Sequence, residues 1–386
     1  MTFTFARTPE LQFGPGTIAR LPEFAARYGT RLLLVIGGSS LQRSPHWPQL
    51  MAGSKARGLD VSVISVSGEP SPELVDSAVR RYQSAGIDVV AAIGGGSVID
   101  SGKAIAAMLT IPDHSVTEYL EGLPGVQSPP GTTLPFIAAP TTAGTGSEAT
   151  KNAVLAKPGE YKRSLRHDHF VPALAIIDPE LACSCPPAVT AACGMDALTQ
   201  LLEGLVSRGA SPLSDALALS GIVRCAAFLV PAATDRGTDI ATRAGMGYAA
   251  YLSGIVLANA GLGIVHGLAG PLGARFPVPH GLACGVLLPP AFAITVKALS
   301  ARAPHSPALA KCAQAGTILA GGAGHPSPDL LIEQLHRLAA VMNLPKLGQF
   351  GIREEHLPAL VAAAGQKTHP VQLLPDEISA ILHAAL

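Results

Sequence analysis

The first half of the chain alternates short apolar runs with segments of helical periodicity. The runs are nearly continuous, and most of them end at glycine or proline; between them, residues 72–85 repeat apolar side chains at helical spacing. Alternation at these lengths predicts a parallel sheet with helices on both faces. We expect strands at 31–36, 61–66, 88–93, 135–139 and 174–177.

After about residue 181 the pattern changes. Extended β-branched runs become scarce, and segments rich in alanine and leucine dominate. This composition and spacing predict an all-helical second half. The proline-containing segment 178–187 separates the two sequence patterns, so we expect domains at 1–181 and 182–386. The segment 112–133 is rich in proline and glycine, and we expect it to form a surface loop. The expected helices are 188–207, 214–229, 240–257, 307–320 and 329–342.

Composition narrows the possible partners. Lysine plus arginine equals aspartate plus glutamate at 27 each, which favours neither nucleic acid nor an anionic membrane. Charged residues make up 14% of the chain, against roughly 25% in typical proteins, which suggests extensive burial and is compatible with a subunit interface. No uninterrupted apolar run approaches the ~20 residues of a membrane helix, and the first ten residues show no secretion signal. Six cysteines without a Cys-x-x-Cys pair are typical of a reducing cytoplasm, where we expect this protein.

A glycine-rich turn follows the third expected strand. Gly94-Gly95-Gly96-Ser97 ends an apolar run and opens the expected helix 98–108. Glycines let backbone amides reach a pyrophosphate, which the N-terminus of a helix attracts. A plain strand-to-helix turn would have the same sequence, so the loop alone is only a candidate nucleotide site.

Four polar residues in the second half form a candidate metal site. Asp196 and Gln200 are four apart, so on a helix they share one face. His266 and His280 lie far downstream, each followed by glycine. If folding brings them together, one carboxylate and two imidazoles surround a divalent cation, and Gln200 adds only a neutral amide oxygen. Taken singly, each residue is more often a structural hydrogen-bonding group.

Five ordered segments resemble the iron-containing (group III) alcohol dehydrogenase family. They occur in family order and at family-like spacing over nearly the whole chain. These segments are Gly94-Gly-Gly-Ser-Val-Ile-Asp-Ser-Gly-Lys103, Pro140-Thr-Thr-Ala-Gly-Thr-Gly-Ser-Glu148, Ile177-Asp-Pro-Glu-Leu181, Gly194-Met-Asp-Ala-Leu198, and Gly261-Leu-Gly-Ile-Val-His266 through Pro279-His-Gly281.

The resemblance implies a fold and a chemistry. The fold is a Rossmann-like parallel-sheet domain that binds the dinucleotide, followed by an all-helical domain that binds metal and substrate, as in dehydroquinate synthase-like proteins. The chemistry is NAD(P)-dependent interconversion of a small alcohol and its aldehyde or ketone, with iron or zinc polarising the substrate oxygen. Family members are often dimers, so we expect a homo-oligomer.

The resemblance also assigns roles to residues. Asp196, His266 and His280 match three metal-ligand positions, and they would carry the catalysis. Gly95, Gly96 and Ser97 would hold the pyrophosphate. The other cofactor-pocket matches are Thr141, Thr142 and Thr145 on the adenosine side, with Asp100, Asn152 and Lys162.

The end of the first expected strand bears on the choice of cofactor. NAD enzymes generally place an acidic side chain there, which repels a 2′-phosphate. This chain has Gly38, Ser39 and Ser40, followed by Arg43, with no acid nearby. Hydroxyl donors and a guanidinium suit a phosphate dianion, as in the NADPH-dependent aldehyde reductases of the family. We therefore predict NADP(H) rather than NAD(H).

Three departures from the family pattern leave alternatives open. Gln200 stands where the family has a ligand histidine, while Gly270 and Pro290 occupy positions where histidine is common. An amide oxygen is a weaker donor than imidazole for iron or zinc, so the metal could be weakly held or absent. The alternatives are a metal-independent oxo-acid reductase of the maleylacetate type, a lyase of the dehydroquinate synthase type, and a non-catalytic dinucleotide-binding protein.

Overall fold

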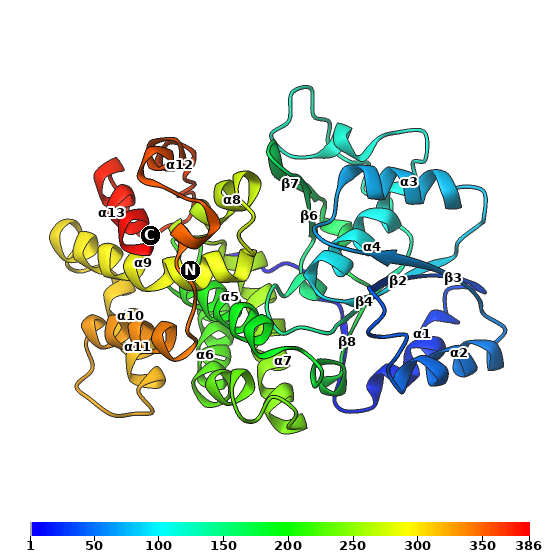
Figure 1. Cartoon of the computed structure of the whole chain (residues 1–386), viewed down its shortest axis with the longest axis horizontal. Coiled ribbons are helices and arrows are strands. Elements are labelled where there is room, and N and C mark those ends of the chain that lie inside the picture. Colours follow the sequence, from blue (N-terminus) through cyan, green and yellow to red (C-terminus); the bar gives the residue numbers. More distant parts are fainter. Residues whose placement is uncertain (1) are drawn as a thin grey trace.

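The apolar runs of the first half fold into one parallel sheet. The computed structural model describes residues 2–386, and in it the strand order is β1-β8-β5-β4-β2-β3 with every neighbouring pair parallel. The parallel sheet and the helical second half confirm the predicted architecture (Figure 1). The strands are β1 (Glu10–Phe13), β2 (Arg31–Gly37), β3 (Asp60–Val66), β4 (Val89–Gly94), β5 (Phe136–Pro140) and β8 (Leu174–Ile177).

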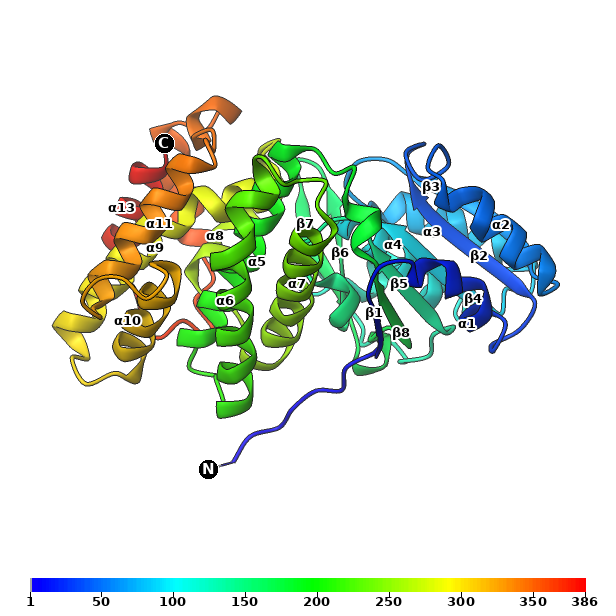
Figure 2. The same ribbon diagram turned by 90° about the horizontal axis from the view of Figure 1, so that it is seen from below.

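Helices cover both faces of this sheet (Figures 1 and 2). Because side chains alternate along a strand, Leu32 and Leu34 of β2 pack with one group of helices, and Leu33 and Val35 pack with the other. The first face carries α1 (Leu21–Ala25) and α2 (His46–Ala56), and the second carries α3 (Pro72–Tyr82) and α4 (Gly96–Met108).

Strand β1 and the antiparallel hairpin of β6 (Asn152–Lys157) and β7 (Tyr161–Arg166) were not anticipated from the sequence. β1 is a short edge strand whose side chains are mostly exposed, and it is held by pairing with β8. Strand β7 is rich in lysine and arginine, and only its Leu165 is buried. Strand β6 has a short apolar run, 153–156, bounded by Asn152 and Lys157. Strands β1 and β7 therefore lack the apolar pattern on which strand prediction depends, and the run in β6 is only four residues long.

The second half is a bundle of helices packed around α5. This helix is buried from Met195 to Val206 and contacts α6, α7 and α9. Helices α8 and α9 were not expected, because prolines interrupt their sequences at Pro271, Pro289 and Pro290. The helices are α5 (Pro187–Val206), α6 (Pro212–Ala233), α7 (Ile240–Ala260), α8 (Ile264–Arg275), α9 (His280–Arg302), α10 (Pro307–Leu319), α11 (Pro328–Val341), α12 (Leu357–Ala363) and α13 (Pro375–Ala385).

Short 3₁₀ helices lie in the connections. One of them, η2, gives the expected surface loop at 112–133 a buried turn that includes Val116 and Tyr119. They are η1 (Thr17–Arg20), η2 (Val116–Tyr119), η3 (Ser147–Ala149), η4 (Asp168–Phe170), η5 (Pro179–Ala182), η6 (Leu347–Phe350) and η7 (Glu354–His356).

Two helices, α6 and α9, have the length and mean hydropathy of a membrane span. Neither helix is an uninterrupted apolar run, because Arg224 lies within α6 and Lys297 within α9. Of the most apolar stretch of α9, 78% is buried inside the protein, against 39% for α6. The apolar character of α9 is therefore accounted for by its place in the core of the helical half.

The two halves approach each other closely where the β5–β6 loop meets α7. Gly146 adopts a left-handed φ of 62°, and a Cβ on Gly254 would lie 2.2 Å from the Gly146 carbonyl oxygen. Only glycine fits such an approach. β8 ends at Ile177 and α5 begins at Pro187, and the predicted domain boundary at 181 falls between these two residues.

Candidate functional site

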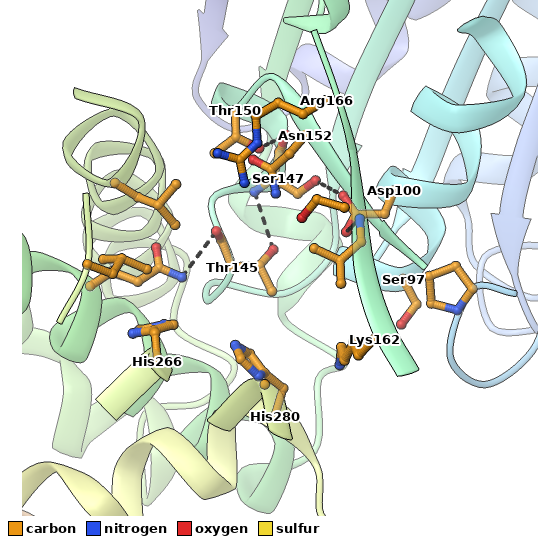
Figure 3. A pocket seen from close by; sticks show the side chains of 18 of the residues that line it. Ser97, Asp100, Thr145, Ser147, Thr150, Asn152, Lys162, Arg166, His266 and His280 are labelled. Carbon is orange, nitrogen blue, oxygen red and sulfur yellow. Dashed lines mark hydrogen bonds between the residues drawn. The ribbon is translucent and has the colours of Figure 1, made fainter. Parts of the chain in front are cut away.

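A cavity of about 330 Å³ lies between the sheet and the helical bundle. Its wall includes Gly96 and Ser97 at the start of α4, Lys162 from the hairpin, and His266 and His280 from the bundle. Figure 3 shows the two histidines side by side, with Ser97 and Lys162 across the cavity from His266. The glycine-rich turn and the histidines, predicted independently from the sequence, thus share one cavity.

Four potential metal donors converge at the helical end of this cavity. Asp196 of α5, His266 of α8, and His280 and Cys284 of α9 each offer one donor atom, and these atoms lie within 4.8 Å of one another. The Nε2 of His266 is 3.3 Å from Asp196 Oδ1, and the Nε2 of His280 is 3.9 Å from the same oxygen. The structure therefore brings together Asp196, His266 and His280 and adds Cys284, which the sequence reading missed.

The start of α9 packs directly against α5. A Cβ on Gly281 would lie 2.5 Å from the carbonyl oxygen of Ala192, so a larger residue would push the two helices apart. Because His280 precedes this glycine, the close approach carries its ring to Asp196. Within residues 2–386, the buried Nδ1 of His280 has no hydrogen-bond partner, so the contacts of its Nε2 decide how the ring is oriented.

Glu203 fixes the orientation of His266. One carboxylate oxygen lies 2.6 Å from His266 Nδ1, and the other accepts a hydrogen bond from the Val265 amide at 2.7 Å. With Nδ1–H donating to Glu203, Nε2 is left as the ring atom that faces Asp196. A carboxylate on the remote nitrogen is the usual partner of a metal-binding histidine. Glu203 is seven residues after Asp196, so two turns of α5 carry both acids on one face.

The charges in the cluster are strongly coupled. Burial opposes ionisation of Asp196, but the hydrogen bond from His266 holds its pKa below the usual value. Burial also disfavours the charged form of His266, which by itself would lower the pKa of the ring. The contacts with Cys284, Asp196 and Glu203 outweigh burial and raise this pKa well above the usual value. Burial lowers the pKa of His280 to about 4 and raises the pKa of the Cys284 thiol to about 12.

Gln200 lies in the cavity wall, and both ends of its amide are engaged. Its Nε2 donates to the Thr145 carbonyl at 3.2 Å, and its Oε1 accepts from the Ser253 hydroxyl at 2.9 Å. The side chain joins α5, α7 and the β5–β6 loop. An amide oxygen has two lone pairs, so Gln200 can keep the bond from Ser253 and also face an ion, and its role as the fourth ligand stays a prediction.

The predicted cofactor residues are distributed over two neighbouring cavities. Asp100, Thr145, Asn152 and Lys162 line the cavity that contains the histidines. Thr141, Thr142 and Ser40 line a second cavity of about 460 Å³. Gly38, Ser39 and Arg43 are exposed on the turn after β2.

Backbone approach explains the glycines of the turn. A Cβ on Gly96 would lie 2.7 Å from Thr145 Cγ2, so a side chain there would push the β5–β6 loop away. Gly95 is the N-cap of α4, and Gly96 and Ser97 form its first turn. The amides of this turn lie where the predicted pyrophosphate would bind.

Polar contacts beneath the cavity keep this region rigid. Asp100 accepts hydrogen bonds from the Ser147 hydroxyl and from the Val154 amide, so α4 is tied to η3 and β6. The buried ammonium of Lys103 donates to the carbonyls of Ser147, Thr150 and Asn152. At the rim, Lys162 forms a 2.8 Å ion pair with Glu69, a partner that the sequence reading did not find.

Two family models match this chain almost from end to end. The model described as iron-containing alcohol dehydrogenase matches residues 8–179, and its C-terminal counterpart matches residues 190–386. The chain belongs to the iron-containing alcohol dehydrogenase family. The resemblance inferred from the motifs is confirmed, and the protein is an alcohol dehydrogenase or aldehyde reductase, for which the family implies a nicotinamide cofactor and a divalent metal.

Individual relatives agree with this assignment. The chain is 36% identical to long-chain-alcohol dehydrogenase 1 of Geobacillus thermodenitrificans, with 98% of this chain and 95% of the relative covered. It is 32% identical to the lactaldehyde reductase of Escherichia coli, with 91% and 90% covered. Among solved structures, sulfoacetaldehyde reductase from Bifidobacterium kashiwanohense in complex with NAD⁺ has 28% identity and a TM-score of 0.85, with 100% and 99% covered.

We predict that Glu203→Gln weakens metal binding in this family member. The amide keeps the size of the side chain but removes the charge that orients His266. Loss of such a partner typically costs about 10–100-fold in metal affinity. Calorimetric titration of the apoprotein with Zn²⁺ measures the change. Glu377→Gln, which weakens an exposed ion pair with Arg302, serves as the control and should leave the Kd unchanged. Equal Kd values for wild type and Glu203→Gln would show that Glu203 does not orient His266.

Proposed function

We propose that this enzyme interconverts a small alcohol and its aldehyde with NADP(H), and that Asp196, His266 and His280 hold the divalent ion. The observation that carries the proposal is the shared cavity: the first turn of α4 and the two histidines line one space. A dinucleotide held at α4 would place its nicotinamide end toward the donor cluster.

The donor set fits a divalent ion. One carboxylate and two imidazoles suit iron or zinc, and Glu203 leaves the Nε2 of His266 free to bind. When bound, the ion supplies Lewis acidity toward the substrate oxygen, and the cofactor supplies the hydride.

The chain itself binds and orients the reactants. The amides of Gly96 and Ser97 hold the pyrophosphate, while the bundle encloses the other end of the cavity. A volume of about 330 Å³ has to hold both the nicotinamide end and the substrate, which favours small alcohols and aldehydes.

The turn after β2 supports NADP(H). Ser39, Ser40 and Arg43 offer two hydroxyls and a guanidinium, and Ser40 lines the second cavity with Thr141 and Thr142. These groups suit a ribose 2′-phosphate. The sulfoacetaldehyde reductase structure contains NAD⁺. We attribute the proposed preference of this chain for NADP(H) to the residues of the turn after β2. A metal-independent or non-catalytic role is not favoured, because the donors converge and the relatives are named as alcohol dehydrogenases and aldehyde reductases.

We expect Asp196→Ala and His280→Ala to abolish turnover and to spare cofactor binding. Each removes a donor at the bundle end of the cavity, while the dinucleotide binds at α4. The kcat should fall by more than about 100-fold, the upper end of what loss of an outer-sphere partner costs. The Kd for NADPH, measured by fluorescence titration, should change less than about threefold. Asp215→Ala, in the ion pair with Lys311, is the control. A near-wild-type kcat in either variant would contradict the proposal that Asp196 and His280 hold a catalytic metal ion.

Arg43→Ala should reduce the use of NADPH selectively. A charge-assisted hydrogen bond is worth about 1.5–3 kcal/mol, and the exposed position of Arg43 places its effect at the lower end. We expect kcat/KM for NADPH to fall about tenfold and kcat/KM for NADH to stay the same. Arg57→Ala, at the C-cap of α2, is the matched control. A wild-type preference for NADH, or an equal loss with both cofactors, would reject the assignment.

A further inference from the structure

Cys284 is the one donor of the cluster for which the proposed mechanism has no role. We propose that its thiolate is the fourth protein ligand, so that the ion is held by one carboxylate oxygen, two imidazole nitrogens and one sulfur. The proposal rests on the proposed metal site at Asp196, His266 and His280. It replaces Gln200 as the candidate for the position that the family fills with histidine.

Four of the six separations between donor atoms are close to those of a tetrahedral site, and all six are within 4.8 Å. An ion with bonds of about 2.0–2.3 Å holds its ligand atoms roughly 3.3–3.8 Å apart in that geometry. Cys284 Sγ is 3.7 Å from His266 Nε2 and 3.8 Å from His280 Nε2. Asp196 Oδ1 is 3.3 Å from His266 Nε2 and 3.9 Å from His280 Nε2. Small side-chain movements would place an ion at bonding distance from all four atoms.

The helix explains how the sulfur reaches the cluster. Cys284 follows His280 by four residues, so both side chains leave α9 on the same face. The remaining buried cysteines provide a comparison. Cys225 and Cys312 are as buried as Cys284, yet across residues 2–386 neither has the imidazole neighbours that Cys284 has. Its placement therefore involves more than the filling of apolar space.

Gln200 is hydrogen-bonded to two neighbouring elements, whereas the sulfur of Cys284 lies within 4.8 Å of the other three donor atoms. The Gln200 oxygen accepts from Ser253 and its nitrogen donates to Thr145. Metal binding would release the thiol proton of Cys284 to solvent and form a metal–sulfur bond. Because thiolate is a soft donor, the exchange of imidazole for sulfur favours zinc over iron.

Cobalt substitution tests this donor set without substrate or cofactor. Apoprotein is loaded with one equivalent of Co²⁺, and its absorption spectrum is recorded. A sulfur ligand gives a thiolate-to-cobalt charge-transfer band in the near ultraviolet, and tetrahedral coordination gives intense d–d bands in the visible. The wild type should show both. A wild-type spectrum with d–d bands and no charge-transfer band would overturn the proposal.

Matched variants assign the band to one residue. Cys284→Ser keeps the size of the side chain and should lose the charge-transfer band, with Zn²⁺ affinity reduced at least about tenfold. Cys225→Ala removes an equally buried thiol and should change neither the band nor the affinity. Circular dichroism confirms that each variant is folded. Cys284→Ala should behave as Cys284→Ser does. Retention of the band in Cys284→Ser would show that the sulfur comes from another residue.

The same samples separate this inference from the proposed function. A charge-transfer band in a protein that turns over no aldehyde would support Cys284 as a ligand and contradict the reductase proposal. Metal-dependent turnover without the band would support the reductase proposal and contradict Cys284.

Discussion

The site depends on the buried contact between Glu203 and the His266 ring. Buried charges are tolerated only when they are paired and hydrogen-bonded, and here one imidazole lies between two carboxylates of the same helix. The contact sets which ring nitrogen points toward Asp196. Helix α9 packs against α5, and the first turn of α8 reaches α5 through Glu203, so both histidines lie beside Asp196.

The same helix connects the donor cluster to the nucleotide loop. Gln200 lies between Asp196 and Glu203 on α5, and it holds Thr145 through the carbonyl and α7 through Ser253. Thr145 in turn lies against Gly96, where the dinucleotide is proposed to bind. Position 200 therefore ties the two halves together. Where the family has a ligand histidine, this chain has Gln200, which bridges α5, α7 and the β5–β6 loop. With Cys284 as the proposed fourth donor, the number of protein ligands stays at four.

Most of the sheet could be predicted from the sequence, because its central strands are buried on both faces. Strand 174–177 was predicted with the bounds that the structure shows, and 31–36 differs only at its end. Edge strand β1 and the β6–β7 hairpin escaped prediction because pairing, and not burial, holds most of their residues. Helices α8 and α9 were missed because prolines inside them looked like breaks.

Some residues of the candidate site could also be predicted from the sequence, and others could not. The spacing of Asp196 and Gln200 and the glycine-rich turn were readable, because each depends on one local element. Glu203 and Cys284 had usable signals, seven residues after Asp196 and four after His280, but a lone acid or cysteine at helical spacing is common. Whether the Gln200 amide faces an ion or Ser253 depends on how α5 and α7 pack, and no local pattern encodes that.

The most direct test is anomalous diffraction from crystals of the zinc-loaded enzyme with NADPH. The account predicts one zinc peak within about 2.0–2.3 Å of Asp196, His266 and His280, with the nicotinamide ring in the same cavity. A peak elsewhere, or these three side chains turned away from one another around an empty or water-filled space, would contradict it.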